Sequence, residues 1–139
     1  MTITIDTNVL VGLWDADDAM HRMARQALDA TFGTRLVISG VVYAELLAAP
    51  GRSETFLDKF CEDAGIVVDW DTEEKVWRAA GRAFQEYVAR RKKQKGGEAR
   101  RLLADFLIGA HAEVNGYTLL TLDEGMYRGS FPRLKIVAV

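Results

Sequence analysis

Short β-branched runs alternate along the chain with longer segments in which apolar residues recur every three or four positions. The alternation of threonine and isoleucine over Thr2–Ile5 predicts a strand. Further strands are expected at Leu36–Ile38, Ile66–Val68, Thr118–Leu122 and Lys135–Val139. Helices are expected at Val9–Trp14, from Asp17 or Asp18 to about Phe32, at Val41–Ala49, from Ser53 to just before Gly65, from Thr72 to about Arg91 and from about Arg100 to Asn115. This alternation predicts an α/β fold with a mainly parallel central sheet and helices on both of its faces.

Residues with defined capping roles mark several of the helix ends. Ser39 and Ser53 precede apolar segments, and a serine side chain at that place accepts a hydrogen bond from the first turn of a helix. Gly33 and Gly116 follow helical segments, and glycine readily adopts the left-handed conformation that closes a helix. These residues predict where four of the helices begin or end.

Length and composition predict one soluble domain that spans residues 1–139. The chain has 139 residues, of which 49% are hydrophobic, so it can bury a sizeable core. Its apolar runs are far shorter than the roughly 18 residues that a transmembrane helix needs, and no basic-then-apolar signal peptide precedes Asp6. The single cysteine, Cys61, cannot form an internal disulfide. We therefore expect a protein of the reducing cytoplasm, without a membrane segment.

Charge is distributed unevenly along the chain. The part from Met1 to Trp77 holds 6 basic and 14 acidic residues, whereas the part from Arg78 to Val139 holds 12 basic and 6 acidic ones. This asymmetry is typical of a polyanion-binding face beside an acidic centre. Charge alone is explained equally well by helix faces that point into solvent.

Two aspartates follow predicted strands. Asp6 ends the first strand, and Asp123 ends the strand that begins at Thr118. Ligand sites in open α/β sheets form at the carboxyl ends of the strands, so these two side chains are expected at one edge of the sheet. Each of them, taken singly, is also ordinary turn or capping chemistry.

Glu45 and Asp105 are expected within helices, on faces that are otherwise largely apolar. Residues three and four positions apart share a helix face. The neighbours of Glu45 by this rule are Val41, Val42, Ala48 and Ala49, and those of Asp105 are Arg101, Leu102, Ile108 and Gly109. Because burying an unpaired carboxylate is costly, each acid needs a partner. A buried salt bridge, such as one between Asp105 and Arg101, is one possibility, and a shared cation is the other.

A divalent cation would relieve the repulsion among the four acids. Carboxylates that converge on one pocket repel each other, and Mg²⁺ or Mn²⁺ removes that conflict by taking oxygen ligands. Two histidines and one cysteine are too few for a typical zinc site, and we expect His21 and His111 to be structural or exposed to solvent. The chain also lacks the glycine-rich motifs GxxxxGK[ST] and GxGxxG, which bind nucleotide phosphates.

A basic segment leads into the helix that carries Asp105. Its cationic residues are Arg90, Arg91, Lys92, Lys93, Lys95, Arg100 and Arg101. Cationic side chains beside a metal site suit contacts with a nucleic-acid backbone, which predicts RNA binding. The alternative is a helix end that is simply solvated.

The four acids lie in short motifs that resemble those of PIN-domain nucleases, and among them the VapC-type toxins of bacterial toxin–antitoxin pairs. The matching segments are Ile5-Asp6-Thr7-Asn8, Tyr43-Ala44-Glu45-Leu46-Leu47, Asp105-Phe106-Leu107-Ile108-Gly109-Ala110-His111-Ala112 and Leu119-Leu120-Thr121-Leu122-Asp123. They occur in the order found in that family and span nearly the whole chain.

The resemblance implies a three-layer α/β/α PIN fold and a ribonuclease that depends on Mg²⁺ or Mn²⁺. Asp6, Glu45, Asp105 and Asp123 would match the acidic metal-binding and catalytic positions, while Asn8 and Thr121 would match residues that support the site. The reaction would be hydrolysis of an RNA phosphodiester by water that the metal activates. The resemblance further implies a homodimer that is inhibited by a small antitoxin protein.

Two other functions compete with this interpretation. One is a metal-dependent phosphatase on a similar sheet, although a haloacid-dehalogenase-like enzyme requires an aspartate where this chain has Asn8. The other is a catalytically weak RNA-binding module that acts through its basic segment. Titration of Mn²⁺ in the presence of RNA separates them, because a binding module retains the RNA uncut.

Overall fold

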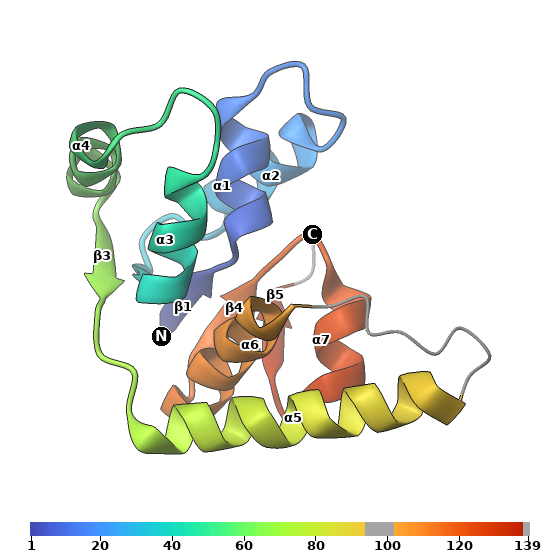
Figure 1. Cartoon of the computed structure of the whole chain (residues 1–139). Helices are drawn as coiled ribbons and strands as arrows, with labels where there is room; N and C mark the ends of the chain where they lie inside the picture. The colour runs from blue at the N-terminus through green and yellow to red at the C-terminus, as the bar shows by residue number, and fades with distance from the viewer. Residues whose placement is uncertain (94–101, 138–139) are drawn as a thin grey trace.

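The computed structural model of the chain describes residues 1–93 and 102–137. Within these residues, five strands form one sheet in the order β3-β2-β1-β4-β5, and every neighbouring pair runs parallel (Figure 1). The strands are β1 (Thr2–Ile5), β2 (Arg35–Ser39), β3 (Ile66–Asp69), β4 (Thr118–Leu120) and β5 (Lys135–Val137). The expected parallel sheet is therefore confirmed.

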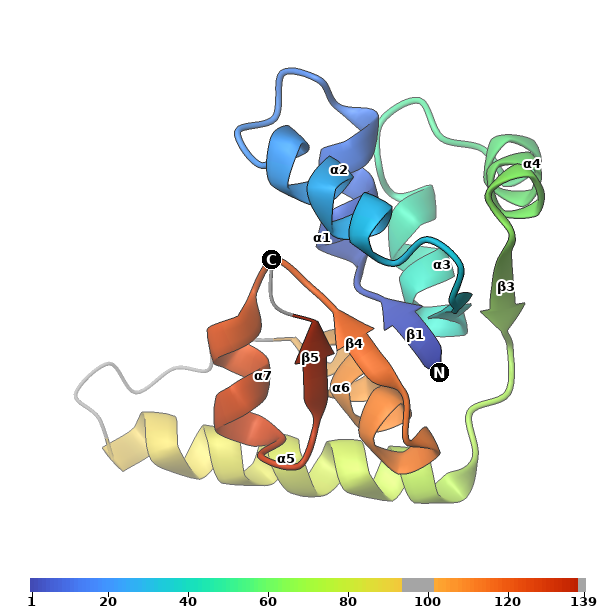
Figure 2. The same cartoon turned by 180° about the vertical axis from the view of Figure 1, so that it is seen from behind.

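Helices cover both faces of this sheet. They are α1 (Thr7–Trp14), α2 (His21–Ala30), α3 (Gly40–Leu47), α4 (Glu54–Ala64), α5 (Glu74–Lys93), α6 (Leu103–Asn115) and α7 (Glu124–Ser130). In Figure 1 α6 lies in front of β4 and β5, whereas in Figure 2 these strands lie in front of α6, and α2 lies in front of α1. The long helix α5 packs along α6 and also contacts α7. This arrangement confirms the expected three-layer α/β/α architecture.

The central strand β1 is deeply buried. Ile3 and Ile5 are 2% and 0% exposed, and they belong to the main hydrophobic core. In the register, Ile5 lies opposite Leu120 of β4 and Thr4 lies opposite Val37 of β2. The ends of β1 and β4 are thus level with each other, and the residues that follow these two strands meet at one edge of the sheet.

Several helix ends are formed by the residues expected to form them. Ser39 accepts a hydrogen bond from the backbone N–H of Val42, and Ser53 accepts one from that of Phe56. Gly116 closes α6 with φ of 70°, a conformation in which any residue with a Cβ atom is strained.

The first two helices begin at other residues than the sequence predicted. Helix α1 begins at Thr7 instead of Val9, because the Asp6 side chain accepts a hydrogen bond from the Thr7 backbone N–H and so caps the helix. Helix α2 begins at His21, because Asp18 forms a turn in which its carboxylate accepts from Met20 N–H and its carbonyl accepts from His21 N–H. That turn occupies the residues that were expected to start the helix. The helix also ends earlier than predicted, at Ala30 with Thr31 as its C-cap, so Gly33 lies beyond the helix end and does not close it.

Larger differences occur in the second half of the chain. Helix α5 begins at Glu74, so Thr72 lies too early to be its cap, and α6 begins at Leu103 instead of near Arg100. Strand β4 ends at Leu120, and helix α7 was not predicted at all. The described part of the chain contains no helix that is both long and apolar enough to cross a membrane.

Helix α7 is held against α6 by a close contact at Gly109. A Cβ atom at this position would lie 2.3 Å from Cε2 of the Phe131 ring, so only glycine leaves room for the ring. Phe131 is the residue that ends α7, and its ring also packs at 6.5 Å, centroid to centroid, from that of Phe106. The packing of Phe131 on α6 therefore determines where α7 lies.

Candidate active site

Asp6 lies at the edge of the sheet, directly after β1, and is 5% exposed. Its backbone N–H donates to the carbonyl of Leu120 at 2.9 Å, which ties it to the end of β4. In the carboxylate, Oδ1 accepts from the Thr7 backbone N–H at 2.8 Å. Oδ2 accepts from the hydroxyl of Thr121 at 2.7 Å and from that of Tyr127 at 3.0 Å. The side chain is thus held by three donors from three segments.

Burial raises the pKa of Asp6 from 3.8 to about 6. The hydrogen bonds from Thr121, Tyr127 and Thr7 oppose this rise, and the nearby carboxylate of Asp105 adds to it. Above this pKa, Asp6 therefore carries a buried negative charge close to a second acid. Such an arrangement favours the binding of a cation.

Tyr127 contacts Asp6 in the candidate site, although the sequence did not single it out. Its side chain lies on α7 and is 1% exposed. Burial raises the pKa of the Tyr127 hydroxyl, and the negative charges of Asp6, Asp105 and Glu45 raise it further. The three carboxylates therefore lie within electrostatic reach of one phenol. The sequence held one signal for this residue, since Asp123-Glu124 is a good helix start that would place Tyr127 in the next turn.

Asn8 and Thr121 connect the ends of β1 and β4. The Asn8 amide oxygen accepts from the backbone N–H of Leu122 at 3.1 Å, and the amide nitrogen is 3.5 Å from Thr121 Oγ1. Thr121 Oγ1 also accepts from the backbone N–H of Asp123 at 3.0 Å while it donates to Asp6. These contacts fix the segment after β4 against the carboxylate of Asp6.

Glu45 approaches Asp6 through a shared neighbour. Its Oε1 atom accepts from the hydroxyl of Thr7 at 2.6 Å, and the backbone N–H of the same threonine donates to Asp6. Glu45 is half-buried on α3, with Val42 and Leu46 of the same helix in the core. Thr7 therefore holds the first acid with its backbone and the second with its side chain.

Asp105 is in the first turn of α6, and not in the middle of a helix as the sequence predicted. Its Oδ2 atom accepts from the backbone N–H of Leu102 at 3.2 Å, so the carboxylate helps to cap the helix. This explains part of its placement, while the salt bridge to Arg101 that the sequence also allowed falls on a residue outside the described part of the chain. Besides capping α6, Asp105 raises the pKa of Asp6 through its negative charge.

Asp123 is half-buried at the residue before α7. Its backbone N–H donates to Thr121, which places it on the same side of the sheet as Asp6. The structure thus links the other three acids to Asp6: Thr7 contacts both Asp6 and Glu45, Thr121 contacts both Asp6 and Asp123, and the charge of Asp105 raises the pKa of Asp6.

The donor set fits a hard divalent cation bound with the help of water and substrate. Within residues 1–93 and 102–137, no three His, Cys, Asp or Glu side chains form a ready-made ligand cluster, so a cation shared by the four acids stays a prediction. Mg²⁺ keeps several water ligands and is often held by one or two carboxylates together with substrate phosphates. Asp6 and Asp105 match this mode, because the two charges influence each other and the ligands are oxygens.

The two histidines have structural contacts away from this site. His111 is 2% exposed, and its Nε2 atom lies 2.9 Å from Oδ2 of Asp69 at the end of β3. His21 Nδ1 lies 3.0 Å from the carbonyl oxygen of Gly12. Both contacts agree with the structural role expected from the sequence.

The basic segment begins in the last turn of α5. Arg90, Arg91, Lys92 and Lys93 form that turn, whereas Lys95, Arg100 and Arg101 lie outside the described residues. The guanidinium of Arg90 donates to Ser130 at 3.4 Å, which brings this turn next to the end of α7. The cationic turn is therefore attached to the helix that carries Tyr127.

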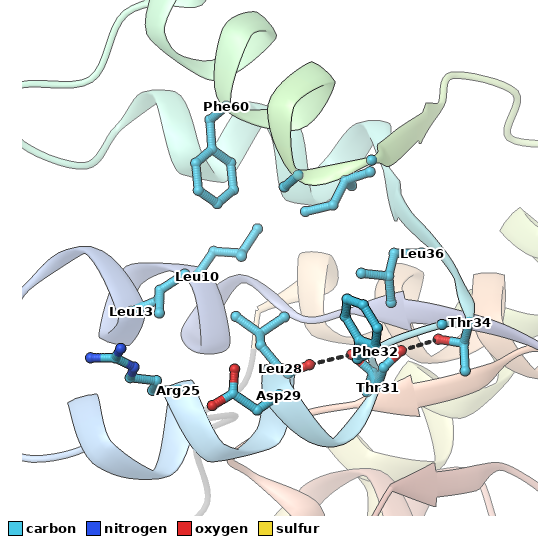
Figure 3. Close-up of a pocket in the computed structure, with 14 residues that line it drawn as sticks. Leu10, Leu13, Arg25, Leu28, Asp29, Thr31, Phe32, Thr34, Leu36 and Phe60 are labelled. Atoms are coloured by element: carbon cyan, nitrogen blue, oxygen red, sulfur yellow. Dashed lines mark hydrogen bonds between the residues drawn. The ribbon is translucent and has the colours of Figure 1, made fainter.

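A separate apolar cavity of about 620 Å³ lies between α1, α2 and α4 (Figure 3). Its apolar lining includes Leu10, Leu13, Leu28, Leu36, Phe60 and Ile66. Arg25 and Asp29 supply charge at its border, and Phe32, which also lines it, is 94% exposed. None of the four acids lines this cavity, so it is separate from the candidate active site.

Solved structures with a similar fold include several toxin–antitoxin complexes. VapBC2 from Rickettsia felis, bound to a DNA fragment from its promoter, is 22% identical with a TM-score of 0.64, over 99% of this chain and 98% of that one. A toxin–antitoxin complex from Klebsiella pneumoniae is 19% identical with a TM-score of 0.67, over 98% and 96%. VapC20 from Mycobacterium tuberculosis, described as a toxin that cleaves the Sarcin-Ricin loop, is 18% identical with a TM-score of 0.61, over 96% and 98%. At these identities the similarity shows the fold.

Comparison of sequences gives the family. No curated protein matches the chain significantly. The family model of the PIN domain matches residues 3–132, which is nearly the whole chain and includes all four acids. The resemblance seen in the sequence motifs is thereby confirmed, and the chain belongs to the PIN-domain family.

Proposed function

We propose that this protein is a metal-dependent ribonuclease that acts in the cytoplasm as the toxin of a toxin–antitoxin pair, with residues 1–139 as one PIN domain. The observation that carries the proposal is the buried carboxylate of Asp6, which is held by three donors and has Asp105 and Glu45 close by. Membership of the PIN-domain family supports it, as does the fold shared with VapC20.

Asp6 and Asp105 would hold a Mg²⁺ or Mn²⁺ ion, and Glu45 and Asp123 would complete the acidic site. When bound, the ion lowers the pKa of water and offsets the charge that develops on the phosphate. The protein contributes the position and ionisation of its acids. Thr121 and Tyr127 keep the Asp6 carboxylate in place, and Thr7 holds Glu45 beside it.

RNA would reach this site along the basic segment. The cationic turn from Arg90 to Lys93 lies next to α7, and Lys95, Arg100 and Arg101 follow it in the sequence. Arginine and lysine side chains neutralise phosphates without reading the bases, so this segment would position the RNA backbone.

The partner would be a small antitoxin, and the toxin would form a homodimer. The apolar cavity between α2 and α4 offers the antitoxin a binding site, because a short amphipathic segment gains its affinity from apolar anchors. The neighbouring structures that are described as toxin–antitoxin complexes support this assignment.

The proposal is tested by RNA cleavage with and without metal. The purified protein is incubated with single-stranded RNA in Mn²⁺ and in EDTA, beside the variants Asp105→Asn and Glu45→Gln. The parent is expected to cleave RNA in Mn²⁺ and not in EDTA. In each variant the rate of cleavage should fall at least about 100-fold, as when a group that stabilises transition-state charge is removed. Asp17→Asn, at an exposed aspartate outside the site, is the control and should cleave like the parent. Retention of uncut RNA in Mn²⁺ would instead identify a binding module.

A further inference from the structure

The two oxygens of the Asp6 carboxylate accept different numbers of hydrogen bonds. An ionised carboxylate can accept about four hydrogen bonds, two at each oxygen. Oδ2 already accepts two, from Thr121 at 2.7 Å and Tyr127 at 3.0 Å. Oδ1 accepts one, from the Thr7 backbone at 2.8 Å. Oδ1 therefore keeps an acceptor position for a cation, whereas both positions of Oδ2 are taken.

Tyr127 is held rigidly in this arrangement. Its side chain is 1% exposed, and its backbone carbonyl accepts from the N–H of Phe131 at 2.7 Å. Phe131 in turn packs against Gly109 of α6, where no larger residue fits. The packing of α7 therefore holds the Tyr127 hydroxyl beside Asp6.

We propose that Tyr127 is a positioning residue of the metal site, which together with Thr121 occupies Oδ2 of Asp6 and leaves Oδ1 as the single oxygen for the cation. This inference rests on the proposed metal-dependent function. Its chemical consequence is selectivity between cations. Mg²⁺ and Mn²⁺ accept one oxygen from each carboxylate in an octahedral shell, whereas Ca²⁺ takes six to eight oxygens and readily uses both oxygens of one carboxylate. Tyr127 therefore disfavours Ca²⁺.

The test compares cation binding by the whole protein in the parent and in Tyr127→Phe. Isothermal titration calorimetry with Mn²⁺, and separately with Ca²⁺, gives both dissociation constants. Loss of the hydroxyl is expected to weaken Mn²⁺ binding by about tenfold, the lower end of the range for residues that orient a metal ligand. Because Oδ2 then gains an acceptor position, Ca²⁺ binding should weaken less or improve, so the preference for Mn²⁺ over Ca²⁺ falls.

Tyr43→Phe is the matched control. The Tyr43 hydroxyl also donates to a carboxylate, Asp58 Oδ1 at 2.8 Å, and the side chain is 7% exposed, but the pair lies outside the site. This variant loses an equivalent hydrogen bond and should keep both dissociation constants of the parent. A fall in Mn²⁺ affinity shared by the two variants would assign the effect to general destabilisation and overturn the proposal.

The double variant Asp6→Asn, Tyr127→Phe shows whether Tyr127 acts through Asp6. If it does, removing the hydroxyl in the Asp6→Asn background should change neither dissociation constant further, which is the strongest form of coupling in a double-mutant cycle. Equal cation preference in parent and Tyr127→Phe would overturn the proposal, while RNA cleavage by the parent in Mn²⁺ would leave the proposed function standing. A parent that neither binds Mn²⁺ nor cleaves RNA would overturn both.

Discussion

When no metal is bound, the replacement Asp6→Asn should stabilise the protein at high pH and destabilise it at low pH. Asp6 has a folded pKa of about 6 against 3.8 for the exposed group, chiefly because it is buried. Below about pH 3 the group is protonated in both states and contributes nothing. As the pH rises, the unfolded chain releases its proton first, so the free energy of unfolding falls until the folded protein also ionises near pH 6. Above that pH the penalty is constant.

The size of this penalty follows from the difference between the two pKa values. A gap of about two pH units corresponds to about 3 kcal/mol in the free energy of unfolding. Asparagine carries no charge at any pH and avoids it. However, the asparagine NH₂ group would face the hydroxyls of Thr121 and Tyr127, which donate to Asp6 in the parent. Because Thr121 Oγ1 already accepts from Asn8 and Asp123, one hydrogen bond is lost, at a cost of about 1–2 kcal/mol.

The two effects together give an expected stabilisation of about 1–2 kcal/mol at pH 8 and a destabilisation of about 1–2 kcal/mol near pH 4. For a chain of this size the gain at pH 8 corresponds to a rise in Tm of roughly 4 °C or more. Urea unfolding followed by circular dichroism, in EDTA and at intervals from pH 4 to pH 8, measures the difference. Asp17→Asn, at an exposed aspartate, serves as the control.

Metal should reverse the order at pH 8. A cation that binds the folded parent stabilises it by about 2.7 kcal/mol at a concentration of 100 times its dissociation constant, and Asp6→Asn should not gain this. A difference between parent and variant that stays constant from pH 4 to pH 8 would refute the reasoning, because it would mean that burial does not perturb the ionisation of Asp6.

Three further outcomes are expected. Gly109→Ala should lower the free energy of unfolding by about 1–3 kcal/mol, because its Cβ atom would collide with the Phe131 ring, and chemical denaturation measures this change. Neutralising Arg90, Arg91, Lys92 and Lys93 together should weaken RNA binding and leave Mn²⁺ affinity unchanged. The plot of log affinity against log salt should become shallower by roughly one unit for each phosphate that the variant no longer neutralises. Leu28→Asp, in the wall of the apolar cavity, should abolish capture of the protein encoded next to this chain while RNA cleavage in Mn²⁺ persists; equal capture would exclude the cavity as the antitoxin site.

The strands and several helix ends could be predicted because local chemistry determines them. Thr2–Ile5 has a period of two, and Ser39, Ser53 and Gly116 have side chains or conformations that suit the end of a helix. Helix α2 was placed too early, because two candidate caps stood in sequence and the choice of a turn at Asp18 depends on packing. Helix α7 was missed, because Gly125 and Gly129 weaken its helical pattern and seven residues are too few for periodicity to appear.

The acids of the site could be found from sequence, but the contacts that hold them could not. Asp6 and Asp123 follow strands, which is a local property, and Glu45 interrupts an apolar helix face. The hydroxyl of Tyr127, in contrast, reaches Asp6 across 121 positions of the chain and from an unpredicted helix. The helix start at Asp123-Glu124 would place Tyr127 in a helix but would not distinguish it from a tyrosine of the core.

The predictions for Gly109 and for Tyr127 are connected, because both residues depend on how α7 packs against α6. Phe131 ends α7 one turn after Tyr127 and packs where Gly109 leaves space on α6, so the position of the glycine determines how closely the phenol approaches Asp6. If this is so, Gly109→Ala should weaken Mn²⁺ binding as well as stability, although Gly109 has no side chain that could bind a cation. The fraction of folded protein must then be held constant, by measuring Mn²⁺ affinity at a temperature where parent and variant are both folded by circular dichroism. Phe131→Leu in the Gly109→Ala background removes the colliding ring atoms and should restore part of the Mn²⁺ affinity. Unchanged Mn²⁺ affinity in folded Gly109→Ala would show that α7 keeps its place without this packing, and that Tyr127 is held by its own burial alone.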